Sequence, residues 1–273
     1  MKNILVLGSA GQIGDPFCKY LKKNNYNVET FDIEDVQFED LRIPNILDNI
    51  LPDIDFVFFL AFDVGGARYL KKYQDTFEFL HNNTAIMYNT FESLRKHKTP
   101  FIFTSSQMSN MNYSSYGVLK SIGEYYTKML GGMVVKFWNV YGPERNLEKA
   151  HVITDFIIKA RDNKKIEMMT DGNEERQFLH VEDCSKAMEI LALKYNEISR
   201  DEELHITSFK WNTIIDVAKI ISDYYNNARI IPGLTSDNVQ LNKRNEPDIY
   251  VLRYWQPEIS LKDGIVDVIE KMK

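Results

Sequence analysis

The most constraining feature of this chain is an alternation, in its first half, of short apolar runs with longer helix-forming stretches. The runs are KNILVLG, YNVETFD, DFVFFLA, PFIFTSS and MVVKFWNV. Helices are expected between them from about residue 12, near 43–50, near 75–96 and around Tyr116. Continuously apolar strands separated by helices are typical of a parallel sheet that is covered on both faces. The alternation therefore predicts a doubly wound α/β domain of the Rossmann type.

The second half of the chain has a different rhythm. Helices are expected near 152–161, 181–195 and 211–226, with short strands at KIEMM, LHIT and RII, but no strand–helix repeat follows. No linker rich in Gly, Ser or Pro separates the halves, so they should pack directly on one another. We predict a Rossmann domain over residues 1–142. A smaller α/β lobe that binds the substrate should be formed mainly by residues 143–273, and the chain can cross between the two lobes.

Composition narrows the class of protein. The 273 residues are 44% hydrophobic and 26% charged, as in ordinary soluble proteins, and the net charge is -6. A negative net charge disfavours a non-specific grip on nucleic acid or on an anionic membrane. No apolar run approaches the roughly 18 residues that span a bilayer, and the N-terminus lacks the apolar core of a signal peptide. We therefore expect a cytoplasmic protein without a nucleic-acid or membrane partner.

Cysteine and histidine usage argues against a disulfide framework and against a metal site. Cys18 and Cys184 are the only cysteines, and they lie in separate helical stretches. The five histidines include no pair at the spacing of a zinc-binding helix, and no CxxC motif accompanies them. We therefore expect no metal.

A glycine-rich loop follows the first predicted strand. The stretch LVLGSAGQIG places Gly8, Gly11 and Gly14 between that strand and the next helix. Glycine permits a tight turn and lets the backbone approach a pyrophosphate, whose charge is favoured at a helix N-terminus. Asp32 ends the second strand 18 residues after Gly14, close to the roughly 20 expected for an acid that binds the adenosine ribose. Because this carboxylate would repel a 2′-phosphate, we predict NAD rather than NADP as the cofactor.

The stretch SSYGVLKSIGE contains a second candidate for chemistry. Tyr116 and Lys120 are four residues apart, so on a helix the phenol and the ammonium share one face. Solvated helices also carry such pairs by chance. The motifs around the pair therefore decide what it means.

Taken together, the motifs resemble those of the extended short-chain dehydrogenase/reductases, and within them the NAD-dependent nucleotide-sugar epimerase/dehydratase family. The likeness covers nearly the whole chain and rests on GSAGQIG, FED, FFLAFDVGG, NNTAIMYNTFES, FIFTSSQ, YGVLK, FWNVYGPE, DGNEERQFLHVEDC and ISLKDGI. The resemblance implies that Tyr116 and Lys120 are a catalytic pair and that Ser106 is their third member. It also implies a homodimer formed through a four-helix contact that includes the tyrosine-bearing helix.

The same resemblance assigns residues to the cofactor and to a nucleotide-diphosphate sugar. For NAD it implies Gly8, Gly11, Gln12, Ile13, Gly14, Asp32, Asp40, Leu41, Leu60, Ala61, Ser105, Tyr116, Lys120 and Phe137. Asp40 would contact adenine, and Ser105 is the alternative to Ser106. For the sugar nucleotide it implies Gln107, Asn139, Lys149, Arg176 and Arg244. A guanidinium is suited to bidentate contacts with a diphosphate.

A tyrosine that acts as a base needs help from neighbouring charge, because a free phenol has a pKa near 10. An ammonium at about 5 Å contributes roughly 3 kcal/mol at an effective dielectric of about 20, or around two pKa units. We therefore predict that Lys120, together with a positive nicotinamide, lowers the pKa of Tyr116. Tyr116 would take the proton of a sugar hydroxyl while NAD accepts hydride, and Ser106 would hydrogen-bond the developing ketone.

Several departures from the family leave the reaction open. Gln107 and Met108 stand where the dehydratases carry an Asp-Glu pair, which argues against elimination of water. DVGG and EKA resemble the GDP-mannose 3,5-epimerase branch, and Lys149 falls on its catalytic lysine, but Met108 occupies the position of its cysteine. Only ten residues separate Ser106 from Tyr116, fewer than in typical members. We expect a 4-epimerase. The alternatives are a 4-dehydrogenase or 4-ketoreductase, and a non-catalytic NAD-binding regulator.

Overall fold

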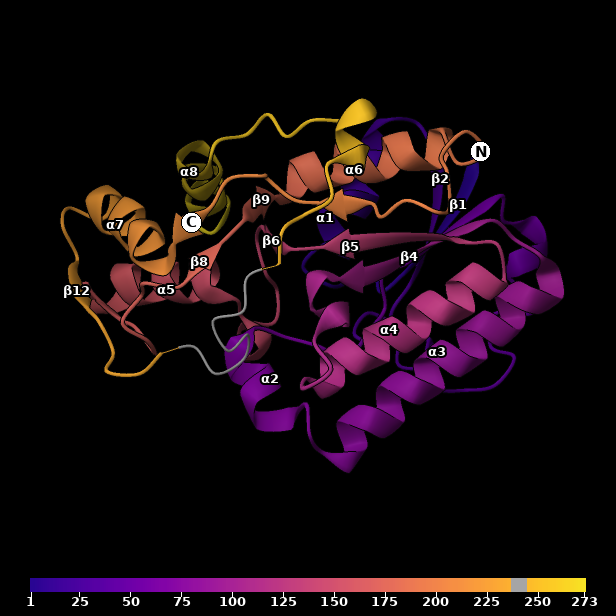
Figure 1. The fold of residues 1–273 in the computed structure, drawn as a ribbon, viewed down its shortest axis with the longest axis horizontal. Helices are drawn as coiled ribbons and strands as arrows, with labels where there is room; N and C mark the ends of the chain where they lie inside the picture. Colours follow the sequence, from indigo (N-terminus) through magenta and orange to yellow (C-terminus); the bar gives the residue numbers. More distant parts are fainter. Residues whose placement is uncertain (237–244) are drawn as a thin grey trace.

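The computed structural model describes residues 1–236 and 245–273. Arg244, one of the two arginines predicted to bind a diphosphate, lies outside the described residues. The described chain forms a larger lobe around a parallel sheet and a smaller lobe beyond the carboxyl ends of β4 and β5 (Figure 1). In the described ranges no helix has both the length and the apolar character that crossing a membrane would require.

A six-stranded sheet forms the centre of the larger lobe. Its strands are β1 (Asn3–Leu7), β2 (Asn27–Phe31), β3 (Phe56–Phe59), β4 (Phe101–Ser106), β5 (Met133–Phe137) and β10 (His205–Ile206). All are parallel, in the order β10-β5-β4-β3-β1-β2. The order changes direction between β1 and β3, where doubly wound sheets open a ligand crevice. The predicted doubly wound parallel sheet is confirmed.

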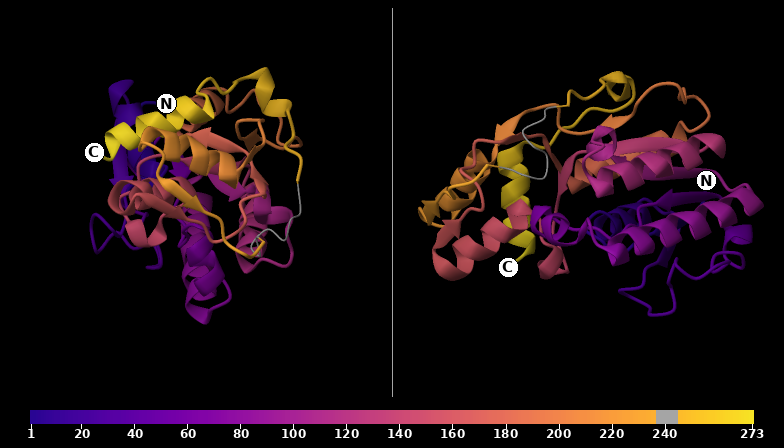
Figure 2. Two further views of the ribbon diagram at one scale, coloured as in Figure 1. Left: turned by 90° about the vertical axis from the view of Figure 1, so that its left-hand side faces the viewer. Right: turned by 60° about the horizontal axis from the view of Figure 1, so that its bottom comes forward.

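Helices cover both faces of this sheet because the side chains of each strand alternate between two cores. Ile4 and Phe58 pack in the core shared with α1 (Gly14–Lys23) and α6 (Val181–Leu193). Leu5 and Phe59 pack in the core shared with α3 (Phe77–His97) and α4 (Ser115–Met129). Figures 1 and 2 show α3 and α4 side by side on their face. Burial on both faces explains why the strands are apolar throughout.

The smaller lobe is built from three helices and short strand pairs (Figure 2). Its helices are α5 (Val152–Asn163), α7 (Ile214–Tyr224) and α8 (Leu261–Lys271). Its strand pairs are β6 (Asn139–Tyr141) with β9 (Phe178–His180), β7 (Lys165–Glu167) with β12 (Arg229–Ile231), and β8 (Glu175–Arg176) with β11 (Asn212–Thr213). Phe156, Ile166, Val217 and Ile265 lie in its core. This core is separate from the two cores of the sheet.

The chain crosses between the lobes more than once. Val181, Cys184 and Met188 on α6 pack in the core that contains α1, and β10 pairs with β5. The sequence pattern placed both stretches in the smaller lobe. They return to the larger lobe because an apolar stripe on α6 and a short apolar strand complete the exposed side of the parallel sheet.

Some local elements differ from expectation. Residues 43–50 form successive turns instead of a helix, and only a short 3-10 helix, η1 (Leu51–Asp53), follows. Pro44 is the second residue of the expected helix, and Asn45, which follows it, has a left-handed φ of 61°, so the helical path is interrupted in its first turn. The stretch MVVKFWNV divides at Trp138 into β5 and β6. The sequence pattern did not predict α2 (Ala67–Tyr73), a short helix that directly follows Gly66.

Candidate active site

A cleft of about 1170 Å³ runs between the ends of the sheet strands and the smaller lobe. Every predicted site residue that the structure describes lines this cleft, from Gly8 on the first strand's loop to Arg176 on β8. Further lining residues come from the segment 144–151, which precedes α5. The cleft therefore has two walls, one made by the strand ends of the larger lobe and one made largely by the smaller lobe.

The glycine loop is held tightly against the loop that follows β3. Gly8 has a φ of 85°, and a Cβ atom there would lie 2.6 Å from the backbone nitrogen of Ala61. A Cβ atom on Gly14 would overlap the carbonyl oxygen of Gly8. By contrast, a Cβ atom on Gly11 would meet only that same oxygen, at 3.4 Å. Packing requires glycine at positions 8 and 14, whereas position 11 faces open space in the cleft.

The N-terminus of α1 fits the pyrophosphate of NAD. Its N-cap residue, Ile13, makes no side-chain capping bond. The N–H of Asp15 already donates to the carbonyl oxygen of Gly11 at 3.1 Å and Pro16 has no N–H, so the N–H of Gly14 is the one that the first turn leaves for a ligand. The amide nitrogen Nε2 of Gln12 is buried without a hydrogen-bond partner, and Gln12 lines the cleft. Unsatisfied donors at a helix N-terminus suit an anion.

Asp32 lies at the end of β2 with both carboxylate oxygens oriented by the backbone. Oδ2 accepts from the N–H of Ala10 at 2.9 Å, and Oδ1 accepts from the N–H of Glu34 at 2.9 Å. Each oxygen keeps a lone pair for a ribose hydroxyl. Glu34, Asp35 and Glu39 line the same end of the cleft, and this negative charge disfavours the additional phosphate of NADP.

Asp40 and Leu41 lie at the same end of the cleft. Asp40 forms a two-pronged ion pair with Arg42, with nitrogen–oxygen distances of 2.8–3.1 Å. This pairing holds the pKa of the Asp40 carboxyl below its usual range. Leu41 is buried beside it. The predicted adenine contact at Asp40 would therefore be made by a carboxylate that already has a partner.

Close packing explains the short interval between Ser106 and Tyr116. Ser106 ends β4, the 3-10 helix η2 (Gln107–Asn110) follows directly, and α4 begins at Ser115. A Cβ atom on Gly117 would overlap the carbonyl oxygen of Met108, so glycine lets α4 start against η2. The N-cap residue Ser114 accepts from the N–H of Gly117 at 3.2 Å. The helix that carries Tyr116 is therefore fixed directly to the end of β4.

Tyr116 and Lys120 both contact the ring of Phe62, which follows β3. The ring centroids of Tyr116 and Phe62 are 5.7 Å apart, and Nζ of Lys120 lies 3.9 Å from the Phe62 centroid. The buried Lys120 ammonium donates to the carbonyl oxygen of Thr104 at 2.8 Å. The two side chains thus share one side of the cleft, as the four-residue spacing implied.

The predicted lowering of the pKa of Tyr116 by Lys120 is wrong. Burial raises the pKa of the Tyr116 phenol to about 12, and the Ser106 hydroxyl beside it opposes this shift. Burial also lowers the pKa of Lys120 to about 7, with Glu124 acting in the opposite direction. Desolvation is the largest cause of both shifts, because burial disfavours the charged form of each group. Any acidification of the phenol must come from a further positive charge.

The two candidate serines point to different partners. Ser105 Oγ donates to Glu124 Oε1 at 2.5 Å. Ser106 Oγ accepts from the N–H of Met108 at 3.1 Å and lies beside the Tyr116 hydroxyl. Of the two hydroxyls, that of Ser106 is therefore the one available to a ligand at the phenol.

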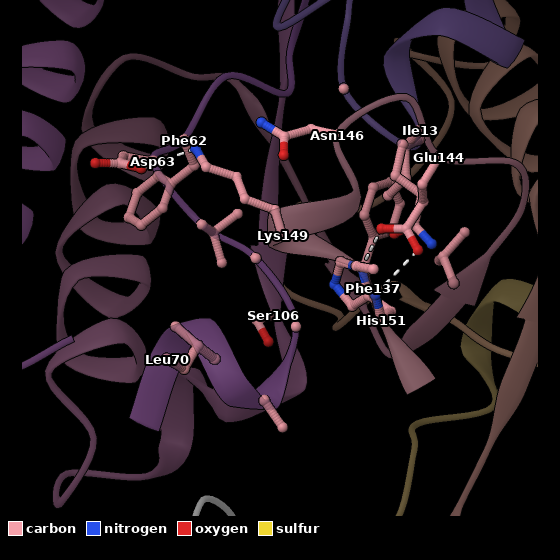
Figure 3. A pocket seen from close by; sticks show the side chains of 18 of the residues that line it. Ile13, Phe62, Asp63, Leu70, Ser106, Phe137, Glu144, Asn146, Lys149 and His151 are labelled. Carbon is pink, nitrogen blue, oxygen red and sulfur yellow. Dashed lines mark hydrogen bonds and ion pairs between the residues drawn. The ribbon is translucent and has the colours of Figure 1, made fainter. Parts of the chain in front are cut away.

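The motifs DVGG and EKA pack against one another across the cleft. Gly66 donates from its backbone N–H to the carbonyl oxygen of Lys149 at 2.9 Å, and a Cβ atom on Gly66 would lie 2.5 Å from the carbonyl oxygen of Ala150. Lys149 Nζ contacts Asp63 Oδ1 at 3.2 Å (Figure 3). The hydroxyl of Tyr69 donates to the same oxygen at 2.6 Å. Although burial opposes it, these contacts and one from Asn82 keep the pKa of Asp63 below its usual range.

Glu144 and His151 form a second pair on the same segment, and the sequence pattern did not single out either residue. Glu144 Oε1 lies 2.7 Å from His151 Nδ1, and Glu144 Oε2 accepts from the backbone N–H of His151 at 3.0 Å (Figure 3). Seven residues separate them, with the 3-10 helix η3 (Leu147–Lys149) between. No periodic spacing connects the pair, so only the folded segment brings it together.

Three other residues predicted for the sugar nucleotide line the cleft. Oδ1 of Asn139 is buried without a hydrogen-bond partner. Both the side-chain and the backbone oxygen of Gln107 accept from Asn245, at 3.1 and 2.8 Å. Arg176 lies on β8 and donates to the carbonyl oxygen of Glu175 at 2.6 Å. In residues 1–236 and 245–273, His, Cys, Asp and Glu side chains form no group of three suited to a metal ion.

Comparison with known proteins identifies the family. The model of the NAD dependent epimerase/dehydratase family matches residues 4–207. GDP-mannose 3,5-epimerase 1 of Oryza sativa subsp. indica is 25% identical, over 96% of this chain and 79% of its own length. The Bacillus subtilis protein YtcB, named an uncharacterized UDP-glucose epimerase, is 26% identical over 97% of this chain and 96% of its own.

A solved structure has the same fold. The UDP-glucuronic acid 4-epimerase of Bacillus cereus, crystallised with UDP-glucuronic acid and NAD, superposes with a TM-score of 0.84 and is 21% identical. The superposition covers 99% of this chain and all of the other. Because the family model matches most of the sequence, including the strand ends that line the cleft, the protein belongs to the NAD dependent epimerase/dehydratase family and is an enzyme that uses NAD.

Proposed function

We propose that the enzyme acts at carbon 4 of a nucleotide-diphosphate sugar and that it is a 4-epimerase. The observation that carries the proposal is the convergence of Ser106, Tyr116 and Lys120 at one side of a cleft whose other end fits a dinucleotide. The B. subtilis and B. cereus relatives are named as epimerases of UDP-sugars. A 4-epimerase needs no acid or base beyond this group.

The protein's own residues supply the proton path. The Tyr116 hydroxyl would accept the proton of the sugar's 4-hydroxyl, and Ser106 Oγ would hydrogen-bond the oxygen as it becomes a ketone. NAD, when bound, supplies the hydride acceptor, and its nicotinamide carries a positive charge. That charge is the further cation that a phenol with a raised pKa requires. After the ketone has turned in the cleft, return of the hydride to the other face of carbon 4 and of the proton from Tyr116 to the oxygen would restore the alcohol.

The neighbours of Ser106 support a reaction without loss of water. Gln107 and Met108 are both buried, and the Gln107 amide is engaged by Asn245. An amide and a thioether exchange no proton near neutral pH. Elimination would need an acid and a base at these positions.

Lys149 and Asn139 are proposed to hold the substrate. Asn139 offers an unpaired buried oxygen, and the ammonium of Lys149 projects into the cleft beside Asp63. Arg176, and Arg244 from outside the described residues, are proposed to contact the diphosphate.

Incubation with a panel of GDP-, UDP-, CDP- and dTDP-sugars tests the proposal. Formation of a new 4-epimer without net change in NAD is expected. Stoichiometric NADH would instead indicate a 4-dehydrogenase. A panel in which no sugar reacts, from protein that retains NAD, would favour a non-catalytic NAD-binding regulator.

We also propose that the enzyme is a homodimer. Ile122, Tyr125 and Met129 recur at helical spacing on α4, and Phe77 and Tyr88 lie on α3, which packs beside α4. Phe77, Tyr125 and Met129 are each at least 70% exposed, which is unusual for large apolar side chains. A second copy would bury both stripes in a four-helix contact. Tyr125→Glu should convert the dimer to a monomer in analytical ultracentrifugation.

A further inference from the structure

The pair formed by Glu144 and His151 is not used by the hydride-transfer chemistry at Tyr116. Both residues line the cleft, yet their exposure differs strongly. The side chain of Glu144 is only 5% exposed, whereas that of His151 is 39% exposed. The carboxylate is therefore enclosed behind the imidazole, and the imidazole is the part of the pair that a ligand can reach.

The geometry of the pair assigns roles to the two ring nitrogens of His151. Glu144 contacts Nδ1 with one oxygen and the His151 backbone N–H with the other, so it holds both the ring and the backbone of one residue. A carboxylate that accepts from Nδ1–H leaves Nε2 as the nitrogen that takes up a proton. Among the described residues, Nε2 of His151 has no hydrogen-bond partner.

His151 is also close to the side of the cleft that carries Tyr116. A Cβ atom on Gly66 would lie 3.1 Å from Cα of His151, so the two backbones are in contact. From Gly66 the chain leads back to Phe62, whose ring packs on Tyr116. The segment 62–66 therefore contacts His151 at one end and Tyr116 at the other, and both side chains line the same cleft.

We propose that His151, held by Glu144, is a second acid–base group of this cleft, which exchanges a proton on carbon 3 or carbon 5 of the sugar with solvent. The proposal rests on the proposed function, because a ketone at carbon 4 makes the hydrogens on both neighbouring carbons acidic. The C–H bond breaks, its proton moves to Nε2, and its electron pair forms the C=C bond of an enolate on the former ketone oxygen. Reversal returns a solvent-derived proton to the same carbon without net oxidation.

Two features favour this role over a purely structural cap on α5. A cap needs only the bond from Glu144 to the backbone N–H, which any residue at position 151 would provide. The additional 2.7 Å contact to Nδ1 orients an imidazole that is exposed to the cleft. Ser106 and Tyr116 would stabilise the enolate oxygen with the same hydroxyl groups that serve the ketone.

Deuterium uptake tests the proposal. The NAD-loaded enzyme is incubated in D2O with UDP-glucose and with UDP-4-keto-6-deoxyglucose, and both sugars are recovered for mass spectrometry and proton NMR. Wild-type enzyme is expected to incorporate deuterium at carbon 3 or 5. His151→Asn should reduce incorporation by about 100-fold or more, and Glu144→Gln should reduce it less, because the amide keeps the bond to the backbone N–H.

A matched control is His97→Asn. His97 also pairs with a carboxylate, since its Nε2 lies 3.3 Å from Asp48 Oδ1, but neither residue lines the cleft. This variant should exchange deuterium like the wild type. NAD content and circular dichroism of each variant report on folding.

The outcomes separate this inference from the proposed function. Conversion of the sugar at carbon 4 without deuterium at carbon 3 or 5 would overturn the role of His151 and leave the 4-epimerase intact. Equal deuterium uptake by wild type and His151→Asn would overturn it as well. Failure of every sugar in the nucleotide-sugar panel to react would overturn the proposed function and this inference together.

Discussion

The two walls of the cleft are built on different principles. The cofactor wall consists of strand ends and glycine contacts, where backbone touches backbone and a single added Cβ atom at Gly8 or Gly14 would clash. The wall formed by residues 144–151 also touches Gly66 through its backbone, but the surface that it presents to the cleft is made largely by charged side chains, such as Lys149, which pairs with Asp63. Backbone contacts shape the first wall, whereas exchangeable side chains set the surface of the second.

This difference suggests a division of labour. A backbone-built wall tolerates little change and suits a cofactor that remains the same in every turnover. Partly exposed ion pairs contribute only about 0–1 kcal/mol each, so the other wall can be altered without unfolding the protein. We therefore expect mutations on the cofactor side to affect folding or chemistry, and mutations on the substrate side to affect substrate affinity.

The largest expected effect follows replacement of the phenol on the cofactor side. Tyr116→Phe removes the only hydroxyl proposed to move the substrate proton, and kcat should fall by about 10²–10⁴-fold. Steady-state kinetics with the best sugar of the panel measures this. Tyr20→Phe is the control, since Tyr20 donates to Glu189 between α1 and α6, away from the cleft. Full turnover by Tyr116→Phe would refute the proposed mechanism.

Lys120 tests whether a residue placed for function lowers the free energy of unfolding. The pKa of Lys120 is about 7 in the folded protein, below its pKa in the unfolded chain. Between pH 10 and pH 7 the lysine is therefore protonated mainly in the unfolded state, and this proton binding lowers the free energy of unfolding. Lys120→Met should therefore raise the free energy of unfolding by a few kcal/mol at pH 7, and this advantage should shrink as the pH is raised toward 10. Urea titrations without added NAD provide the measurement.

Lys136→Met is the contrasting variant. Lys136 is also buried, but it pairs with Glu203 at 2.6 Å and with Glu124 at 3.6 Å. Removing it leaves two carboxylates without their cation, so this variant should lose stability. Loss of stability in Lys120→Met as well would show that Lys120 is held by compensating contacts and is not strained.

The glycine loop provides a third comparison. Gly14→Ala should lower the free energy of unfolding by about 1–3 kcal/mol, because its Cβ atom would overlap the backbone of Gly8. Gly11→Ala should fold normally, since its Cβ atom meets the protein only at 3.4 Å, but it should bind NAD more weakly. Thermal unfolding and NAD titration distinguish the two. Unchanged NAD affinity in Gly11→Ala would mean that the pyrophosphate lies elsewhere.

The smallest effect is expected at the pair of Lys149 and Asp63. Lys149→Met should raise the KM for the sugar nucleotide more than it lowers kcat, because the proposed role of the ammonium is binding. A double-mutant cycle with Asp63→Asn should give a coupling energy in stability of about 0.2–1 kcal/mol. A much larger coupling would show that the wall of residues 144–151 is as rigid as the cofactor wall.

The same contrast explains which parts of the fold and of the site the sequence predicts. The parallel sheet, the glycine loop and Asp32 are local patterns whose backbone requirements appear directly in the residue types. The pair of Glu144 and His151 has no such pattern, because it depends on how a 3-10 turn folds. The return of α6 and β10 to the larger lobe has no local pattern either, because it depends on which part of the sheet each element covers or extends.

The pKa of Tyr116 could not be derived from spacing either. A four-residue interval brings a phenol and an ammonium to one face, but it does not reveal how much water the fold removes from each. In the folded protein Phe62 packs on both side chains, and desolvation is the largest cause of the shift in each pKa. The sign of a pKa shift therefore depends on burial, which belongs to the tertiary structure.

The central claim is that hydride passes from carbon 4 of a sugar nucleotide to NAD held by the glycine wall. A single-turnover experiment tests it most directly, with enzyme in excess over a panel sugar that carries deuterium on carbon 4. The account predicts that the bound dinucleotide transiently gains one deuterium as the ketone forms. Conversion of the sugar while the dinucleotide stays free of deuterium would contradict it.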